Sequence, residues 1–136
     1  MPINMPLRVL LIEDNPDYVS LVQQWLSVGT AAAFVLSWTN SLEAGLSHLK
    51  QFSVDVILLD LGLPDSGGFE TFRRVKLQSA NVPLIVLSGD NSEDLALQLA
   101  RASTKVYVIY KSSSHGETLG KAIQDAAAAR STSVDA

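Results

Sequence analysis

The chain has 136 residues, of which 47% are hydrophobic and 18% charged, a composition typical of one globular domain rather than a disordered chain. Its net charge of −4 disfavours direct nucleic-acid binding, and the absence of cysteine excludes disulfides, a thiol nucleophile and cysteine-bound zinc. No apolar run approaches the ~20 residues that span a bilayer, and Met1–Leu7 lacks a signal-peptide pattern, so we expect a cytoplasmic protein without membrane insertion.

Short apolar runs alternate with helix-like segments along the chain. They predict strands over residues 8–12, 34–38, 54–59, 82–87 and 106–110. Most of these runs are continuous rather than alternating, which is typical of parallel strands that helices cover on both faces.

Helix-start signals stand between the runs. Asn15 and Pro16 predict an N-cap and a first-turn proline for the first helix. The apolar residues expected on one face of that helix are Tyr18, Leu21, Val22 and Trp25. Polar caps followed three residues later by an acid predict the second, fourth and fifth helices, at Asn40, Asn91 and Ser114.

The third helix and the extent of the last, fifth helix complete the helix predictions. The third begins near Gly67–Gly68. The last runs from Gly116 to Ala129, with its inward residues at Leu119, Ala122, Ile123 and Ala126. This alternation predicts an α/β domain over residues 7–129, with a parallel five-stranded sheet and five helices in three layers. Residues 1–6 form an N-terminal extension, and 130–136 form a polar tail expected to fray.

Polar residues follow four of the five predicted strands. Ligands of an open α/β sheet bind outside the carboxyl ends of its strands. The residues there are Glu13 and Asp14, Asp60, Ser88 with Gly89, and Lys111. Taken singly, each fits a plain structural role, such as a helix-dipole partner, a turn acid or a solvated charge. Their arrival at one sheet edge favours a shared site.

The charges at this edge indicate a divalent cation. Glu13, Asp14 and Asp60 contribute −3 and Lys111 contributes +1, which leaves −2. Oxygen-only ligands that leave room for water suit Mg²⁺ better than zinc. His48 and His115 lack ligand spacing and are expected to have plain surface or packing roles.

A carboxylate, a bound Mg²⁺, a hydroxyl and a lysine can together receive a phosphoryl group. The carboxylate attacks phosphorus and forms an acyl phosphate. Positive charge from Mg²⁺ and Lys111, with hydrogen bonds from Ser88, would stabilise the equatorial oxygens.

Four stretches carry a resemblance to a known family: LLIEDNPDY at 10–18, VDVILLDLGLPDSGG at 54–68, IVLSG at 85–89 and YK at 110–111. Together they resemble the receiver domain of response regulators in bacterial two-component signalling, in particular single-domain members of the chemotaxis-regulator type. The resemblance implies a flavodoxin-like, doubly wound sheet of strand order 2-1-3-4-5.

The resemblance also implies a role for each site residue. Asp60 would be the phosphoacceptor, Ser88 the switch hydroxyl and Lys111 the cation that pairs with phosphate. The implied Mg²⁺ ligands are Asp14 directly, Glu13 through water, Asp60, and the backbone carbonyl of Gly62. The chain would catalyse only its own phosphorylation and dephosphorylation.

Three departures from the family pattern cluster late in the chain. The position three residues before Lys111, usually aromatic, is Val108, and Tyr110 is the aromatic that shares its strand face. Ser103–Lys105 replaces a small Gly-Ala pair, and Ser112 replaces proline. The chemistry is therefore expected to be intact and the readout altered.

The implied partners are a histidine kinase or histidine phosphotransfer protein, docked near 15–24, and a downstream protein. The downstream partner would bind the face of the fourth helix, fifth strand and fifth helix, where the candidate residues are Gln98, Lys105, Tyr107 and Tyr110. One alternative is a degenerate receiver that acts as a phosphorylation-independent interaction module. Another is a flavodoxin-like cofactor protein or small phosphohydrolase, which the acidic first loop and the absence of glycine-rich phosphate motifs disfavour.

Overall fold

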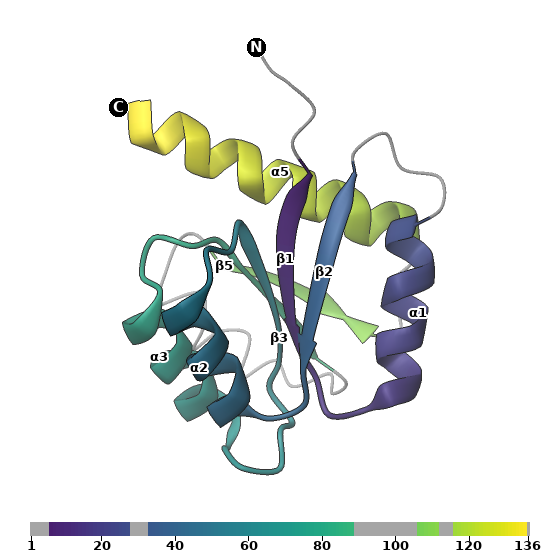
Figure 1. Cartoon of the computed structure of the whole chain (residues 1–136), viewed down its shortest axis with the longest axis vertical. Coiled ribbons are helices and arrows are strands. Elements are labelled where there is room, and N and C mark those ends of the chain that lie inside the picture. The colour runs from purple at the N-terminus through teal and green to yellow at the C-terminus, as the bar shows by residue number, and fades with distance from the viewer. Residues whose placement is uncertain (1–5, 28–32, 89–105, 112–115, 136) are drawn as a thin grey trace.

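The chain folds into a five-stranded parallel sheet with helices on both faces (Figure 1). The computed structural model describes residues 6–27, 33–88, 106–111 and 116–135. The strands are β1 (Leu7–Ile12), β2 (Phe34–Thr39), β3 (Val56–Asp60), β4 (Leu84–Ser88) and β5 (Val106–Tyr110), in the order β2-β1-β3-β4-β5. The helices described are α1 (Pro16–Ser27), α2 (Leu42–Gln51), α3 (Gly68–Gln78) and α5 (Gly116–Asp135).

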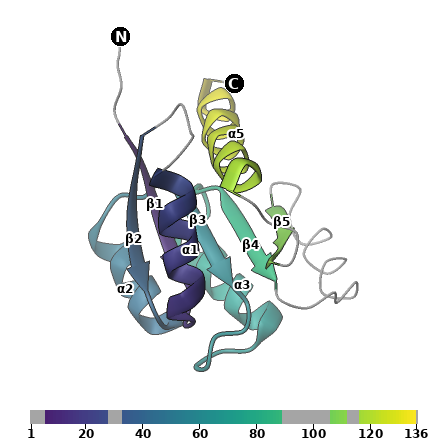
Figure 2. The same cartoon turned by 90° about the vertical axis from the view of Figure 1, so that its right-hand side faces the viewer.

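Two apolar layers sandwich the sheet. On one face, β-strand side chains such as Leu11 and Leu58 pack with Val22 of α1 and Ile123 of α5. On the other face, strand residues pack with Leu42 of α2 and with Phe72 and Val75 of α3. Figure 2 shows α1 in front of the sheet and α2 and α3 behind it. The predicted three-layer α/β fold and strand order are confirmed.

The predicted strands are all present, with small shifts at their ends. β3 and β4 each begin two residues later than the apolar runs indicate, at Val56 and Leu84, and each ends one residue later. Asp60 and Ser88 are therefore the last residues of buried strands rather than the first residues of loops. Both polar side chains are held at the sheet edge by the strand ladder itself.

The first helix confirms its predicted start but not its whole predicted face. Asn15 Oδ1 accepts a hydrogen bond from the Asp17 N–H at 2.9 Å, as an N-cap does. Tyr18 and Val22 are buried as predicted, whereas Leu21 is 43% exposed. Val19 and Leu26 are the further core residues of α1, because the buried stripe is rotated toward them.

The second helix begins one residue later than predicted. Ser41, not Asn40, is the N-cap, and its Oγ accepts from the Ala44 N–H at 3.2 Å. Both residues can cap a helix, so the local pattern does not separate them. A second acceptor residue, Asp65 from the loop between β3 and α3, also binds this helix end.

The last helix is longer than predicted. α5 starts at Gly116 as expected but continues to Asp135, so the predicted helix end at Ala129 is corrected. No proline or glycine follows Gly120 to end the helix. Its inward residues Leu119, Ile123 and Ala126 are buried, as predicted. The fourth predicted helix, from Asn91, and the cap at Ser114 lie outside the described residues.

Replacing Gly45 with alanine is expected to destabilise the protein although alanine favours helix. A Cβ at Gly45 would lie 2.5 Å from Ile12 Cδ1 and 2.9 Å from Ile12 Cγ1. Ile12 is fully buried, so the side chain cannot move away freely. We expect a loss of about 1–3 kcal/mol in urea unfolding. Adding Ile12→Val to Gly45→Ala removes Cδ1, the closest atom, and should recover part of that loss. If the stability losses of the two single variants simply add in the double variant, the clash is contradicted.

Replacing Asp65 with alanine is expected to weaken the start of α2. The N–H groups of Leu42 and Glu43 donate to Asp65 Oδ1 and Oδ2 at 3.0 and 3.1 Å, and these bonds lower the pKa of Asp65. We expect Asp65→Ala to lose about 1 kcal/mol near neutral pH. Because the folded-state pKa lies below the unfolded one, this contribution is present above about pH 4 and is lost as the pH falls further.

Urea unfolding at pH 7 and pH 3 measures this effect. The difference between wild type and Asp65→Ala should shrink at the lower pH. Asp125→Ala is the matched control, since that carboxylate is exposed and lies 3.9 Å from Lys121 on the same helix. An Asp65 effect no larger than that of Asp125 would rule out the capping role.

Candidate functional site

The carboxyl edge of the sheet gathers the predicted polar residues. β1 and β3 are neighbours in the sheet, and β3 and β4 pair so that Asp60 lies opposite Leu87. Ser88 lies opposite Tyr110 in the pairing of β4 with β5. Parallel strands end at one edge, so residues from distant parts of the sequence meet there.

Three acids form a compact cluster at this edge. One carboxylate oxygen from each of Glu13, Asp14 and Asp60 lies within 4.8 Å of the others. Glu13 is fully buried and Asp60 is nearly so, whereas Asp14 is exposed. The cluster therefore has a buried floor and one side open to solvent.

Lys111 supplies positive charge to the cluster. Its Nζ lies 2.6 Å from Glu13 Oε1 and 3.6 Å from Asp60 Oδ1. The same atom lies 4.6 Å from the centre of the Tyr18 ring. The residue follows β5 directly, so its stem is fixed by the strand end while its ammonium reaches across the edge to the acids.

Backbone and side-chain donors hold the acids in place. The Gly62 N–H donates to Asp60 Oδ1 at 3.1 Å, and the Asn15 N–H donates to Glu13 Oε2 at 3.1 Å. Trp38 Nε1, at the end of β2, donates to the Glu13 carbonyl oxygen at 2.7 Å. The Trp38 bond thus ties the loop that carries the acid pair to the neighbouring strand β2.

The electrostatics of the cluster favour a further cation. Burial raises the pKa of Glu13 to about 7, although the hydrogen bond to Lys111 opposes this shift; the charge of Asp60 raises it further. A single ammonium therefore does not compensate the acids. Carboxylate oxygens alone, with an open side for water, form a donor set that fits a hard divalent cation such as Mg²⁺.

The other predicted residues lie at or beside this edge. Ser88 is buried at the end of β4, and Gly62 lies in the loop after β3. Val108 packs in the core layer of α2 and α3, and Tyr110 is half-buried opposite Ser88. Tyr107 is 39% exposed on β5. The predicted residues that lie outside the described part of the chain are Gly89, Gln98, Ser103–Lys105, Ser112 and His115.

Two aromatic residues of the site were not predicted from the sequence. The sequence pattern places Tyr18 on the buried face of the first helix and Trp38 in a strand, with no role at the site. Their contacts with Lys111 and Glu13 join residues far apart in sequence, and no local spacing signals them. His48 has the plain packing role expected of it, with its ring 4.8 Å from that of Phe52.

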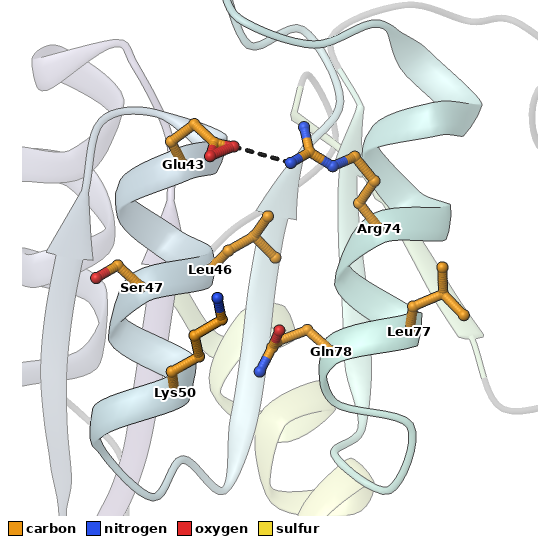
Figure 3. A pocket seen from close by; sticks show the side chains of 7 residues that line it. All are labelled: Glu43, Leu46, Ser47, Lys50, Arg74, Leu77 and Gln78. Atoms are coloured by element: carbon orange, nitrogen blue, oxygen red, sulfur yellow. Dashed lines mark hydrogen bonds and ion pairs between the residues drawn. The ribbon is translucent and has the colours of Figure 1, made fainter.

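A second hollow lies between α2 and α3, apart from the acidic cluster (Figure 3). It has a volume of about 400 Å³. An ion pair between Arg74 and Glu43, at 2.8 Å, crosses it, and Leu46 and Leu77 supply apolar surface.

Among the described residues, no helix is long and apolar enough to cross a membrane.

Comparison with known proteins gives one consistent answer. A family model of the response regulator receiver domain matches residues 9–124. Cell cycle response regulator CtrA from Brucella ovis is 36% identical over 83 residues, which are 61% of this chain and 34% of that protein. CtrA from Brucella abortus matches to the same extent, so the chain spans about a third of the length of these curated relatives.

Solved structures share the fold at low sequence identity. A receiver domain of an HD domain-containing protein from Pseudomonas fluorescens has a TM-score of 0.85 at 18% identity, covering 99% of this chain and 96% of that one. Chemotaxis response regulator CheY4 of Vibrio cholerae has a TM-score of 0.74 at 22% identity, covering 90% and 99%.

Proposed function

The chain belongs to the response regulator receiver domain family, and from that membership and the geometry of the acidic cluster we propose that Asp60 accepts a phosphoryl group. One observation carries the proposal: a nearly buried carboxylate at the end of β3 lies beside two further acids and within 3.6 Å of an ammonium. Receiver domains are signalling modules, so we propose that the chain transfers a phosphoryl group to itself and processes no free substrate.

The contacts of Asp60 suggest which oxygen attacks. In the described part of the chain, both the Gly62 N–H and the Lys111 ammonium contact Oδ1. We therefore assign Oδ2 as the nucleophile. Its new bond to phosphorus forms an acyl phosphate while the bond from phosphorus to the donor's nitrogen or oxygen breaks, and the donor keeps that electron pair.

Lys111 and Ser88 are proposed to receive the phosphoryl oxygens. The ammonium is already near Asp60, and its charge would offset the negative oxygens. Ser88, opposite Tyr110 at the end of β4, is the hydroxyl proposed to donate to them. Little covalent help is needed, because phosphoryl transfer depends mainly on position and charge.

The proposed metal site consists of Asp14, Asp60 and Glu13, with the backbone carbonyl of Gly62. The three carboxylates meet the requirement for oxygen donors held close together. Glu13 would act through water, since its Oε1 is paired with Lys111. When bound, Mg²⁺ would supply positive charge to the oxygens of the transferring group.

We propose a histidine kinase or histidine phosphotransfer protein as the donor. Asn15, Pro16 and Asp17 are exposed where α1 begins beside the cluster, so a donor that reaches Asp60 would also contact this turn. The downstream partner is proposed to bind the side of β5 and α5, where Tyr107 is exposed.

Intact-mass measurement with acetyl phosphate and Mg²⁺ tests the proposed function. The wild-type chain should gain the mass of one phosphoryl group, and peptide mapping after borohydride reduction should locate it at Asp60. A chelator should prevent the gain. No added mass under these conditions, or label at another residue, would refute the proposal.

A second candidate is a receiver that no longer switches. Val108 occupies a core position of β5 where an aromatic is usual, which favours a fixed interaction module. Amide chemical shifts with and without beryllofluoride and Mg²⁺ separate the two functions. Shift changes that reach Tyr107 and α5 support switching, whereas changes confined to the acidic edge support the fixed module.

A further inference from the structure

The ammonium of Lys111 has an aromatic contact in addition to its two acids. Nζ lies 4.6 Å from the centre of the Tyr18 ring, within the range over which a ring face attracts a cation. Because Lys111 is only one-fifth exposed, water screens this attraction less than at an open surface.

The Tyr18 ring is itself firmly held. It lies in the first turn of α1, two residues after Pro16, and is only 7% exposed. The Trp25 ring meets it edge-on, with centroids 6.0 Å apart and planes at 85°. The ring is thus a fixed surface, and the flexible partner in this contact is the long side chain of Lys111.

The acids alone would not hold the ammonium where the proposed reaction needs it. Nζ is 1.0 Å nearer to Glu13 Oε1 (2.6 Å) than to Asp60 Oδ1 (3.6 Å). Glu13 is also a proposed metal-site residue, so the metal site would compete with Lys111 for its carboxylate oxygens. The Tyr18 ring is neutral and is not part of the proposed metal site, so the metal would not compete for its contact with the ammonium.

We propose that Tyr18 is a positioning residue that keeps the Lys111 ammonium at the acidic cluster, within reach of a phosphoryl group on Asp60. The contact between Tyr18 and Lys111 rests on the geometry of the structure, whereas its effect on phosphoryl transfer rests on the proposed function. It assigns to this tyrosine a role beyond packing of α1 against the sheet.

Proton NMR tests the geometry without any phosphorylation. Ring currents should shift the ε-methylene protons of Lys111 upfield in wild type, with Lys111→Met identifying the resonance by its loss. Tyr18→Phe keeps the ring and should keep the shift, whereas Tyr18→Leu should abolish it. A shift that is unchanged in Tyr18→Leu overturns the proposal.

The rate of phosphorylation by acetyl phosphate tests the consequence. Tyr18→Leu should slow uptake about three- to tenfold, and Tyr18→Phe should stay within about twofold of wild type. In the Lys111→Met background, Tyr18→Leu should have no further effect, because the two residues act as a unit. If the two substitutions instead lower the rate of uptake independently, so that their effects add in the double variant, the positioning role is overturned.

Val22→Ala controls for simple loss of packing. Val22 is fully buried in the same helix and the same core layer, but it carries no aromatic ring that could attract the ammonium of Lys111. Its rate should stay near that of wild type at equal folded fraction; a loss as large as that of Tyr18→Leu would reduce Tyr18 to a packing residue. If wild type takes up no phosphoryl group, the proposed function fails, and the NMR result still decides the position of the lysine.

Discussion

Replacing Asp60 with asparagine is expected to abolish phosphoryl uptake. The amide oxygen cannot serve as the carboxylate nucleophile, and Asp60 is the acid that the structure places at the end of β3, beside the Gly62 N–H and Lys111. The expected loss is more than about 10³-fold in rate, since the reacting atom itself is removed. Intact mass after incubation with acetyl phosphate and Mg²⁺ measures it.

The asparagine variant should nevertheless fold. Its amide oxygen can still accept the hydrogen bond from the Gly62 N–H, and the substitution removes one negative charge from beside Glu13. We expect its urea midpoint to equal or exceed that of wild type. Asp125→Asn, at an exposed carboxylate on α5, serves as the control and should take up phosphate normally. Phosphate gained by Asp60→Asn would place the acceptor elsewhere.

The fold follows from patterns that are local in the sequence. Continuous apolar runs such as 56–59 predict buried parallel strands, because only covered faces tolerate them. Parallel strands share one carboxyl edge, so the polar residues that follow them must converge. The meeting of Glu13, Asp14, Asp60 and Lys111 could therefore be predicted without coordinates.

What could not be predicted depends on contacts between distant residues. Asp65 caps α2 from another loop, and Trp38 binds the Glu13 carbonyl oxygen from the neighbouring strand. Tyr18 fits a core position equally well whether or not a lysine lies over its ring. The predicted cap at Asn40 is wrong for a different reason: Ser41 is of a residue type that accepts the same hydrogen bond, so the local pattern does not separate the two.

Replacing Lys111 with methionine is expected to change phosphorylation and metal binding in opposite directions. In the described part of the chain, Lys111 is the cation of the acidic cluster, at 2.6 Å from Glu13 and 3.6 Å from Asp60. Without it, the phosphoryl oxygens lose a preorganised positive group, and we expect a fall of about 10²-fold in the rate of uptake. Mass spectrometry at timed intervals measures that rate.

The same substitution leaves the three acids without their ammonium, so Mg²⁺ should bind more tightly. For charges a few ångströms apart, removal of one repelling positive charge corresponds to an increase in affinity of up to about tenfold. Calorimetric titration with MgCl₂ measures the affinity. Lys121→Met, at an exposed lysine on α5, is the matched control and should change neither quantity. Weaker Mg²⁺ binding in Lys111→Met would mean that the lysine organises the carboxylates rather than competing for them. An unchanged rate of uptake would mean that its charge does not reach the phosphoryl group, and the assignment of Lys111 to the reaction would then be wrong even if Asp60 remained the acceptor.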